Sequence, residues 1–492
     1  MAGKRYLMLM ATATLAIVAA SSPAAALPAE PASAFRDAID GAIGAPTLTH
    51  AHVGLLAIDA VTGNVLYARN ADDDFVPAST LKLLVGSAAL ARLGPAYALT
   101  TGVLASGLPA LGTLAGDLYL RGGGDAQLAD ADLDAAAAAV ASAGIRRIAG
   151  SLVADASRYD APRYPLGWAI DDVPYGYAAV PSALALDLNV VPVRVLPGSA
   201  ARAPTTLQAP APSRTLTVEN ASITGAPGSA DTTDLARPWD RPDTIEVIGS
   251  YPLGAPLSDD LSPSVPDPSA YTAEMFERAL AVHGVTIGNG VRFGPTPPGA
   301  SQVWSHHSQP LRTLLRDFWL PSTNLIGEQL LEELGAVVGP TSGTNGSDDT
   351  RARGISSEMA WLRSIGGSAD AVTIVDGSGL SAYDRVEPRT LATILRADWR
   401  GPFRDSVLAA LPVAGTSGTL RSTFAQPPLR GAVFAKTGTE NHARALAGYV
   451  RTRSGGTVIF ALMVDDWTDE SPQAQTALDA ARAAILTALV RR

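Results

Sequence analysis

The hydrophobic and polar positions near the two ends of the chain predict the strands of one antiparallel sheet. Residues 52–59 and 64–70 are apolar segments on either side of a Thr-Gly turn, which is the pattern of a β-hairpin. Three further β-like segments lie near the C-terminus, at 431–438, 444–453 and 457–465, and a Ser-Gly-Gly turn joins the last two. Because strands occur at both ends, we expect one domain that is built from both termini.

A helical repeat follows the last predicted strand. Apolar side chains recur there at the spacing of one helix face: Leu478, Ala481, Ile485, Leu486 and Leu489. Ser471 is a suitable N-cap, and Pro472 suits the first position of a helix. The polar face of this helix is hardly basic, so we expect the helix to pack on the core of the protein rather than on a membrane surface.

The middle of the chain has a different composition. Residues 98–299 contain many short β-like runs separated by Gly, Pro and Ser, and residues 190–250 are rich enough in Pro, Ser and Thr to form a smaller subdomain. These patterns predict an α+β fold, in which residues 27–97 and 300–492 form an antiparallel sheet flanked by helices. The inserted β-rich domains separate these two parts.

The first residues have the pattern of an export signal. Lys4 and Arg5 precede an apolar region at 6–20, and three alanines at 24–26 suit a cleavage site. We expect residues 1–26 to be removed and the protein to be exported, either to the periplasm or to the extracellular side in association with the cell wall. A transmembrane anchor is the alternative, but the apolar run is short and rich in alanine. No second run approaches the roughly 20 residues of a membrane span.

Composition narrows the possible functions. The formal net charge is −10, so there is no basic surplus to neutralise phosphates, and we expect no nucleic-acid partner. The chain has no cysteine, which excludes thiolate chemistry and Cys-type metal sites. Basic positions are almost all arginine, and lysine occurs only at positions 4, 82 and 436. We therefore expect that Lys82 and Lys436, the two lysines of the expected mature chain, have a chemical role that arginine cannot fill.

Lys82 lies in the sequence Pro-Ala-Ser-Thr-Leu-Lys, where the apolar positions predict that a helix begins at about residue 79 or 80. Ser79 and Lys82 would then share one helix face, within one turn of each other. A serine needs a base to become a good nucleophile. A lysine can be that base if burial or a second cation lowers its pKa, whereas an arginine stays protonated. Alone, however, this pattern is usually a helix cap beside a solvated lysine.

Two later segments point to the same chemistry. Residues 320–335 place Ser322 and Asn324 at the start of an amphipathic helix, and residues 434–450 place a Lys-Thr-Gly-Thr sequence on a strand that ends at a turn. The candidate residues of the second segment are Lys436, Thr437, Gly438 and Thr439. The glycine removes a side chain where something must approach the backbone closely. Each segment is ordinary alone, but their order and the presence of both lysines indicate one active site.

With S-x-x-K, S-x-N and K-T-G in this order, the chain resembles the penicillin-recognising serine enzymes. More specifically, it resembles the D-alanyl-D-alanine carboxypeptidase/endopeptidase family, the class C low-molecular-mass penicillin-binding proteins. Segments beyond the motifs carry the same resemblance: PASTLKLL, GDLYLRGGGDAQL, VPSALALDLN, TIVDGSGLSAYDRVEPRTL and LPVAGTSGTLR. The large insertion between the first and second motifs is also characteristic of that family.

The resemblance implies that Ser79 attacks the carbonyl between two D-alanines of a peptidoglycan stem peptide, and that Lys82 accepts the serine proton. Ser322 would relay a proton toward the leaving amine, and Asn324 would help to orient Lys82 and the backbone amide of the substrate. It also implies that β-lactam antibiotics acylate Ser79, and that the reaction needs no cofactor and no metal ion.

The third motif would bind the substrate. The resemblance implies that Lys436 holds positive potential near the terminal carboxylate and lowers the pKa of the catalytic lysine. The hydroxyls of Thr437 and Thr439 would bind that carboxylate, and the N–H groups of Ser79 and Thr439 would form an oxyanion hole. Glu440 stands where the family often has an apolar residue, and we expect its side chain to point away from the site.

Other classes of protein share parts of this pattern. A serine β-lactamase shares the three motifs, but such enzymes are usually compact, and an insertion of about 200 residues favours a polymeric substrate. A non-catalytic peptidoglycan-binding protein would have no use for the reactive serine and its lysine. A Ser-His-Asp hydrolase lacks its G-x-S-x-G motif here, and DGSGLS at 376–381 is better explained as a tight turn that shapes the cleft. The histidines at 50–52 and 306–307 have no third metal ligand at a recognisable spacing.

Overall fold

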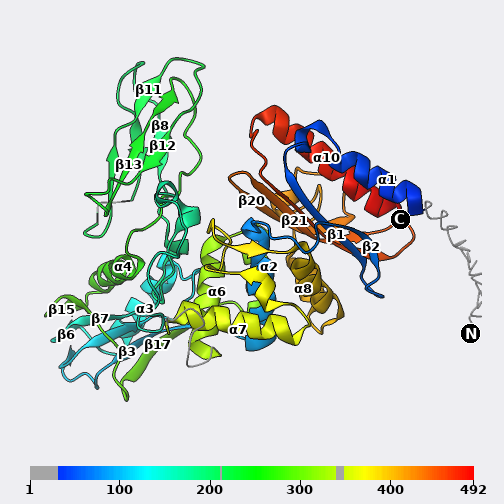
Figure 1. The fold of residues 1–492 in the computed structure, drawn as a ribbon. Coiled ribbons are helices and arrows are strands. Elements are labelled where there is room, and N and C mark those ends of the chain that lie inside the picture. Colours follow the sequence, from blue (N-terminus) through cyan, green and yellow to red (C-terminus); the bar gives the residue numbers. More distant parts are fainter. Residues whose placement is uncertain (1–31, 211–212, 339–347) are drawn as a thin grey trace, which may run out of the picture.

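The computed structural model describes residues 32–210, 213–338 and 348–492 (Figure 1). The expected export signal at 1–26 lies outside the described residues. The fold has three parts, which we name by their elements. The main body contains α1, α2, β1, β2, α5–α10, β18 (Val372–Thr373), β19 (Arg385–Val386) and β20–β22. The inserted body contains β3–β7, α3, α4 and β15–β17, and the arm contains β8–β14.

A five-stranded antiparallel sheet forms the centre of the main body. In spatial order its strands are β2 (Val65–Arg69), β1 (His52–Asp59), β22 (Thr457–Asp465), β21 (Ala443–Arg451) and β20 (Val433–Glu440). β1 pairs with β2 as the predicted hairpin and with β22 on its other side. Strands from the two ends of the chain therefore lie side by side, and the predicted strands and α+β class are confirmed.

Successive side chains of this sheet enter two different cores. In β22, Phe460 and Leu462 join the core beneath α1 (Ala32–Ile43) and α10 (Pro472–Arg491), whereas Ile459 joins the core on the opposite face. This alternation is the two-residue period of a strand that is covered on both faces. Figure 1 shows α1 and α10 lying side by side over the sheet.

The final helix is the one expected from its apolar repeat. Ser471 accepts a hydrogen bond from the Ala474 N–H at 3.2 Å, which caps the helix, and Pro472 is its first residue. The apolar positions predicted to form one helix face are buried in the core between the sheet and the helices α1 and α10: Leu478, Ala481, Ile485, Leu486 and Leu489. Among the described residues, no helix has the length and apolar character needed to cross a membrane.

Helices cover the other face of the sheet. They are α2 (Lys82–Leu93), α5 (Leu311–Trp319), α6 (Asn324–Val337), α7 (Thr350–Ser364), α8 (Pro388–Arg400) and α9 (Arg404–Ala410). Trp319 is fully buried among them. Its ring packs on Gly86 so closely that a Cβ at that position would lie 2.6 Å from Trp319 Cζ2, and its indole N–H donates to the Lys82 carbonyl at 2.9 Å. Trp319 thus fixes α2 against α5.

The inserted body has its own sheet and core. The sheet order is β16 (Val291–Phe293), β7 (Leu152–Asp155), β5 (Leu118–Arg121), β3 (Thr100–Ala105) and β17 (Ser301–His307). α3 (Asp130–Ser142) and α4 (Pro268–Val282) contribute to its core, and β4 (Thr113–Leu114), β6 (Arg147–Ile148) and β15 (Thr286–Ile287) form a small second sheet. β17 pairs with β3, so this body continues to His307, beyond the expected boundary at 299.

The arm projects from the inserted body (Figure 1). Its described residues form these short strands: β8 (Arg194–Leu196), β9 (Thr206–Gln208), β10 (Thr217–Asn220), β11 (Ile223–Gly225), β12 (Asp234–Ala236), β13 (Thr244–Ile248) and β14 (Ser250–Pro252). A small apolar core that includes Ile245 and Val247 holds them together.

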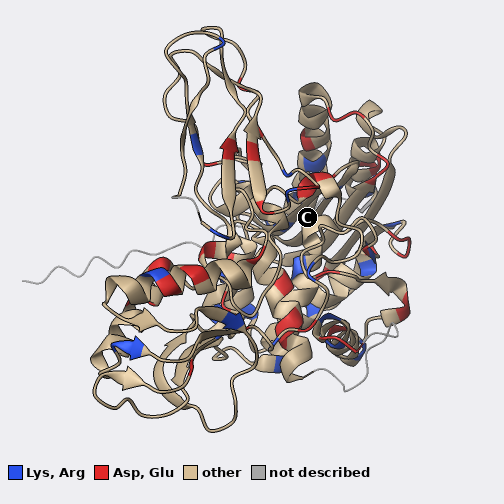
Figure 2. Ribbon diagram, turned by 90° about the vertical axis from the view of Figure 1, so that its left-hand side faces the viewer, with Lys and Arg blue, Asp and Glu red and all other residues tan. Residues whose placement is uncertain are grey.

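Acidic and basic residues are interspersed over all three parts of the molecule (Figure 2).

The packing of Trp319 predicts a large effect of its removal. Trp319→Ala should lower the free energy of unfolding by about 3–5 kcal/mol, because it removes a fully buried aromatic ring and leaves a cavity between α2 and α5. Urea unfolding followed by circular dichroism measures the change. Trp239→Ala is the matched control, since Trp239 is 91% exposed and its loss should change stability by no more than about 0.5 kcal/mol. Equal effects of the two substitutions would contradict this account of the core.

Candidate active site

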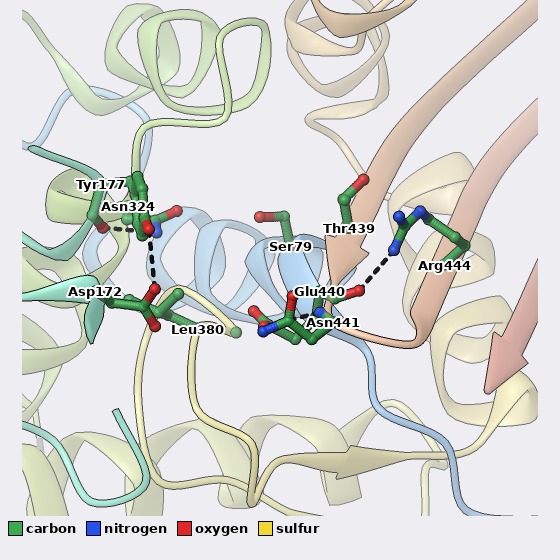
Figure 3. Close-up of a pocket in the computed structure, with 10 residues that line it drawn as sticks. Ser79, Asp172, Tyr177, Asn324, Leu380, Thr439, Glu440, Asn441 and Arg444 are labelled. Carbon is green, nitrogen blue, oxygen red and sulfur yellow. Dashed lines mark hydrogen bonds between the residues drawn. The ribbon is translucent and has the colours of Figure 1, made fainter. Parts of the chain in front are cut away.

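Ser79 lies in a short 3₁₀ turn, Ala78–Leu81, that leads directly into α2. Its side chain is half-buried and faces a cleft between the main body and residues from the inserted part of the chain (Figure 3). The preceding residue, Ala78, has a φ of +45°, a left-handed conformation that is strained for a residue other than glycine. The helix predicted to begin at residue 79 or 80 is observed as the 3₁₀ turn from Ala78, followed by α2 from Lys82.

The Lys82 amine is placed to take a proton from Ser79. Lys82 Nζ lies 2.7 Å from Ser79 Oγ and 2.7 Å from the Ser378 carbonyl oxygen, and the lysine is fully buried. Burial lowers the pKa of Lys82 to about 7, although the nearby carboxyl groups of Asp376, Glu328 and Asp384 act in the opposite direction. A substantial fraction of the amine can therefore be neutral at physiological pH, as a base must be.

The second lysine supports the second motif. Lys436, on β20, is fully buried, and its Nζ donates to Ser322 Oγ at 2.8 Å and to the Thr437 carbonyl at 2.9 Å. Ser322 has a φ of +67°, a strained left-handed conformation immediately before α6. Burial, and then the positive charge of Lys82, lower the pKa of Lys436 well below its usual value. Lys82 thus acts on Lys436, and burial is the main cause of the pKa shift in both lysines.

Gly438 permits the close approach that the sequence predicted. A Cβ at this position would lie 2.6 Å from the Pro77 carbonyl oxygen and 3.2 Å from the Ala78 Cβ. β20 can therefore pack against the turn that carries Ser79. Thr437 donates or accepts a hydrogen bond with Thr419 at 2.8 Å between the hydroxyl oxygens, and Thr439 is exposed in the cleft.

The cleft has a volume of about 340 Å³ and is lined by residues from both parts of the chain: Ser79, Asp172, Tyr177, Asn324, Gly379, Leu380, Thr439, Glu440, Asn441 and Arg444. Glu440 lines this cleft, and the carboxyl groups of Asp172 and Asp376 contribute to raising its pKa, after burial. The expectation that Glu440 points away from the site is therefore wrong. Gly379 and Leu380 belong to the DGSGLS segment, which confirms that this turn shapes the cleft.

Asn324 is near Ser79 but has a different partner from the one expected. Its side-chain amide donates to the Tyr177 carbonyl oxygen at 2.8 Å, which connects the start of α6 to the inserted part of the chain. Within the described residues, no hydrogen bond joins Asn324 to Lys82. The Ser378 carbonyl orients the lysine instead. Sequence reasoning missed this contact because a main-chain acceptor leaves no side-chain signature.

Several buried carboxyl groups surround the base. Burial is the main cause that raises the pKa of Glu328 to about 8, and it raises those of Glu358 and Asp384 well above their usual values. Burial therefore favours the protonated form of all three groups, and it opposes the charge by which Glu328 and Asp384 raise the pKa of Lys82. In the described part of the chain, no group of three or more His, Cys, Asp or Glu side chains is arranged to hold a metal ion.

The chain matches the model of the D-Ala-D-Ala carboxypeptidase 3 (S13) family over residues 35–486. It is similar to a D-alanyl-D-alanine carboxypeptidase from Actinomadura sp. (strain R39), with 34% identity over 430 residues that cover 85% of this chain and 78% of that protein.

Solved structures show the same fold. The structure of penicillin binding protein 4 (dacB) from Haemophilus influenzae matches with a TM-score of 0.79 and 22% identity, and covers 90% of this chain and 97% of that one. A structure of the same protein in complex with a novel β-lactam matches with a TM-score of 0.74 and 20% identity, over 92% of this chain and 99% of that one.

The lowered pKa of Lys82 predicts a pH-dependent reaction. If the neutral amine is the base, the rate of acylation of Ser79 by a fluorescent penicillin should rise with pH up to about 7 and then level off. Lys82→Arg should react at least about 100-fold more slowly at every pH, because the guanidinium stays protonated. Stopped-flow measurements from pH 5 to about pH 9 test this. An arginine variant that keeps the wild-type rate would contradict the role of Lys82.

The packing at Gly438 predicts a second effect. Gly438→Ala should slow acylation by about tenfold or more, because the added Cβ would push β20 away from the Ser79 turn. Gly107→Ala is the control, since a Cβ there has nothing within 4 Å and should leave the rate unchanged. The measurement is the same acylation assay on both variants. Similar rates in the two variants would mean that the approach of β20 to Pro77 is not needed.

Proposed function

The chain belongs to the D-Ala-D-Ala carboxypeptidase 3 (S13) family, and from this premise we propose that it is a serine DD-peptidase that acts on peptidoglycan stem peptides. The observation that carries the proposal is the 2.7 Å contact between Ser79 Oγ and the Nζ of a fully buried lysine. The activity is that of a D-Ala-D-Ala carboxypeptidase, an endopeptidase, or both.

In the proposed reaction, Lys82 takes the Ser79 proton while Ser79 Oγ bonds to the carbonyl carbon between two D-alanines. The N–H groups of Ser79 and Thr439 stabilise the oxyanion of the tetrahedral intermediate. The C–N bond then breaks, and the proton that Lys82 took from Ser79 passes to the leaving amine by way of the Ser322 hydroxyl, to which Lys436 Nζ donates a hydrogen bond at 2.8 Å. Water hydrolyses the ester in the second half of the reaction and restores the Ser79 hydroxyl.

The third motif supplies recognition of the C-terminal carboxylate. A bound carboxylate favours the protonated form of Lys436, which then provides positive potential behind β20. The Thr437 and Thr439 hydroxyls supply donors at the strand surface. A β-lactam carries a comparable carbonyl and carboxylate, so it should acylate Ser79 and remain attached. The protein would meet both kinds of molecule outside the cytoplasm, as the expected signal peptide at 1–26 implies.

Labelling with a fluorescent penicillin tests the proposed function. Mass spectrometry of a proteolytic digest should find the adduct on Ser79, and Ser79→Ala should take up no label. The wild-type protein should also release D-alanine from a peptide that ends in D-Ala-D-Ala. An adduct elsewhere, or labelling of Ser79→Ala, would contradict the assignment. Rapid hydrolysis of the penicillin without a lasting adduct would identify a β-lactamase instead.

A further inference from the structure

Asp376 is the centre of the turn that contacts the catalytic lysine. Its carboxylate is fully buried, and it accepts hydrogen bonds from the N–H groups of Ser378 at 3.1 Å, Gly379 at 2.6 Å and Ser381 at 2.7 Å. These three donors wrap the turn around the carboxylate and stabilise its charge. The carbonyl of Ser378, within this turn, is the oxygen that accepts from Lys82 Nζ at 2.7 Å.

The turn is wedged between the two helices that carry the first two motifs. A Cβ at Gly379 would lie 2.0 Å from the Ala78 carbonyl oxygen, and a Cβ at Gly377 would lie 2.4 Å from the Gly327 carbonyl oxygen on α6. The Gly377 N–H also donates to Glu328 at 3.0 Å. Any movement of this turn must therefore change the position of the Ser378 carbonyl relative to Lys82.

A segment from the inserted part of the chain reaches the same carboxylate. We call residues 161–178 the crossing segment, because it connects the inserted body to the cleft. The indole N–H of Trp168 donates to Asp376 Oδ2 at 2.9 Å, and Ser381 Oγ donates to the Leu166 carbonyl at 2.8 Å. The crossing segment also contributes the Tyr177 carbonyl that accepts from Asn324.

We propose that Asp376 is a positioning residue for the Lys82 base, and that Trp168 acts on the base by holding the same carboxylate. This inference rests on the proposed function. It makes the inserted part of the chain a component of the catalytic apparatus as well as a wall of the cleft. A displacement of the crossing segment would loosen the turn and withdraw the Ser378 carbonyl from Lys82.

Asp376→Asn tests the first half of the proposal. The amide has one acceptor oxygen, so it can accept from Ser381 and Trp168 at the Oδ2 position or from Ser378 and Gly379 at the Oδ1 position, but not from both pairs. The turn should therefore shift, and acylation by penicillin should slow by about 10-fold to 100-fold. The pH midpoint of acylation should also move downward, because a negative charge that raises the pKa of Lys82 has been removed. The carboxyls of Glu328 and Asp384, which also raise the pKa of Lys82, remain in place, and so does Lys436, whose own pKa Lys82 lowers.

Asp155→Asn is the matched control. Asp155 is also buried, and its carboxylate accepts hydrogen bonds from the Ser157 N–H at 3.1 Å and the Thr296 N–H at 2.7 Å. It lies in β7 of the inserted body, whereas the carboxyls that raise the pKa of Lys82 are those of Asp376, Glu328 and Asp384. The pH midpoint of acylation should therefore stay at the wild-type value. An equal downward movement in both variants would overturn the specific role of Asp376.

Trp168→Phe tests the second half, because it keeps an aromatic ring and removes only the N–H donor. It should slow acylation in the wild-type background and have no further effect in the Asp376→Asn background. Such non-additivity is expected when two residues act through one contact. Independent, multiplicative losses in the double variant would show that Trp168 does not act through Asp376.

A readout that needs no activity separates this inference from the proposed function. The Trp168 indole N–H resonance, assigned as the signal missing from Trp168→Phe, should move in Asp376→Asn and stay in place in Asp155→Asn. If penicillin labels wild-type Ser79 but Asp376→Asn keeps the wild-type rate, pH midpoint and indole signal, the inference is wrong and the proposed function stands. If wild-type Ser79 takes up no penicillin, the proposed function fails, and the role given to Asp376 in catalysis fails with it.

Discussion

Two lysine amines are buried without ion-pair partners, and the architecture around the cleft depends on how the protein holds them. Among the described residues, neither Lys82 nor Lys436 forms a salt bridge, and their hydrogen bonds go to hydroxyl and main-chain carbonyl oxygens. Burial of an unpaired ammonium is unfavourable, and a lysine responds by losing its proton more easily. The same cost that weakens the folded state therefore makes Lys82 available as a base.

The elements that provide these oxygens come from distant parts of the chain. The hydroxyls are at the starts of α2 and α6, and the carbonyls are on β20 and in the turn at 376–381. Gly438 allows β20 to approach the turn that carries Ser79, and Gly379 allows the turn at 376–381 to do so from the other side. Close backbone packing thus replaces carboxylate partners, which would hold the amines in their protonated form.

Much of the main body could be predicted from the sequence because its signals are local. The hairpin, the C-terminal strands and the last helix follow from short hydrophobic patterns, and each is present in the structure. The rarity of lysine marks Lys82 and Lys436 as candidates for a chemical role. Gly438 in the third motif predicts a close backbone approach, and the structure places it against the Pro77 carbonyl. The structure brings Ser79 and Lys82 together in one contact, and Ser322 and Lys436 in another.

The parts that could not be predicted depend on contacts between distant segments. The Ser378 carbonyl is 296 positions from Lys82, and a main-chain oxygen has no residue type that marks it. The Trp168 contact with Asp376 and the Tyr177 contact with Asn324 exist only because the inserted part folds back onto the cleft. Glu440 was placed wrongly because its direction at the strand end depends on its neighbours across the cleft. The expected boundary at residue 299 places β17 in the main body. Its pairing with β3, a strand far away in the sequence, cannot be inferred from the residues of β17 alone.

The most direct test of the buried amines is their titration by NMR. The expected mature chain contains only two lysines, so protein labelled with ¹⁵N-lysine should give two side-chain amine signals, and Lys436→Arg would assign them. The account predicts that Lys82 titrates at a pKa of about 7 in the free enzyme. A Lys82 pKa near 10.4, the ordinary value for a solvated lysine, would contradict it.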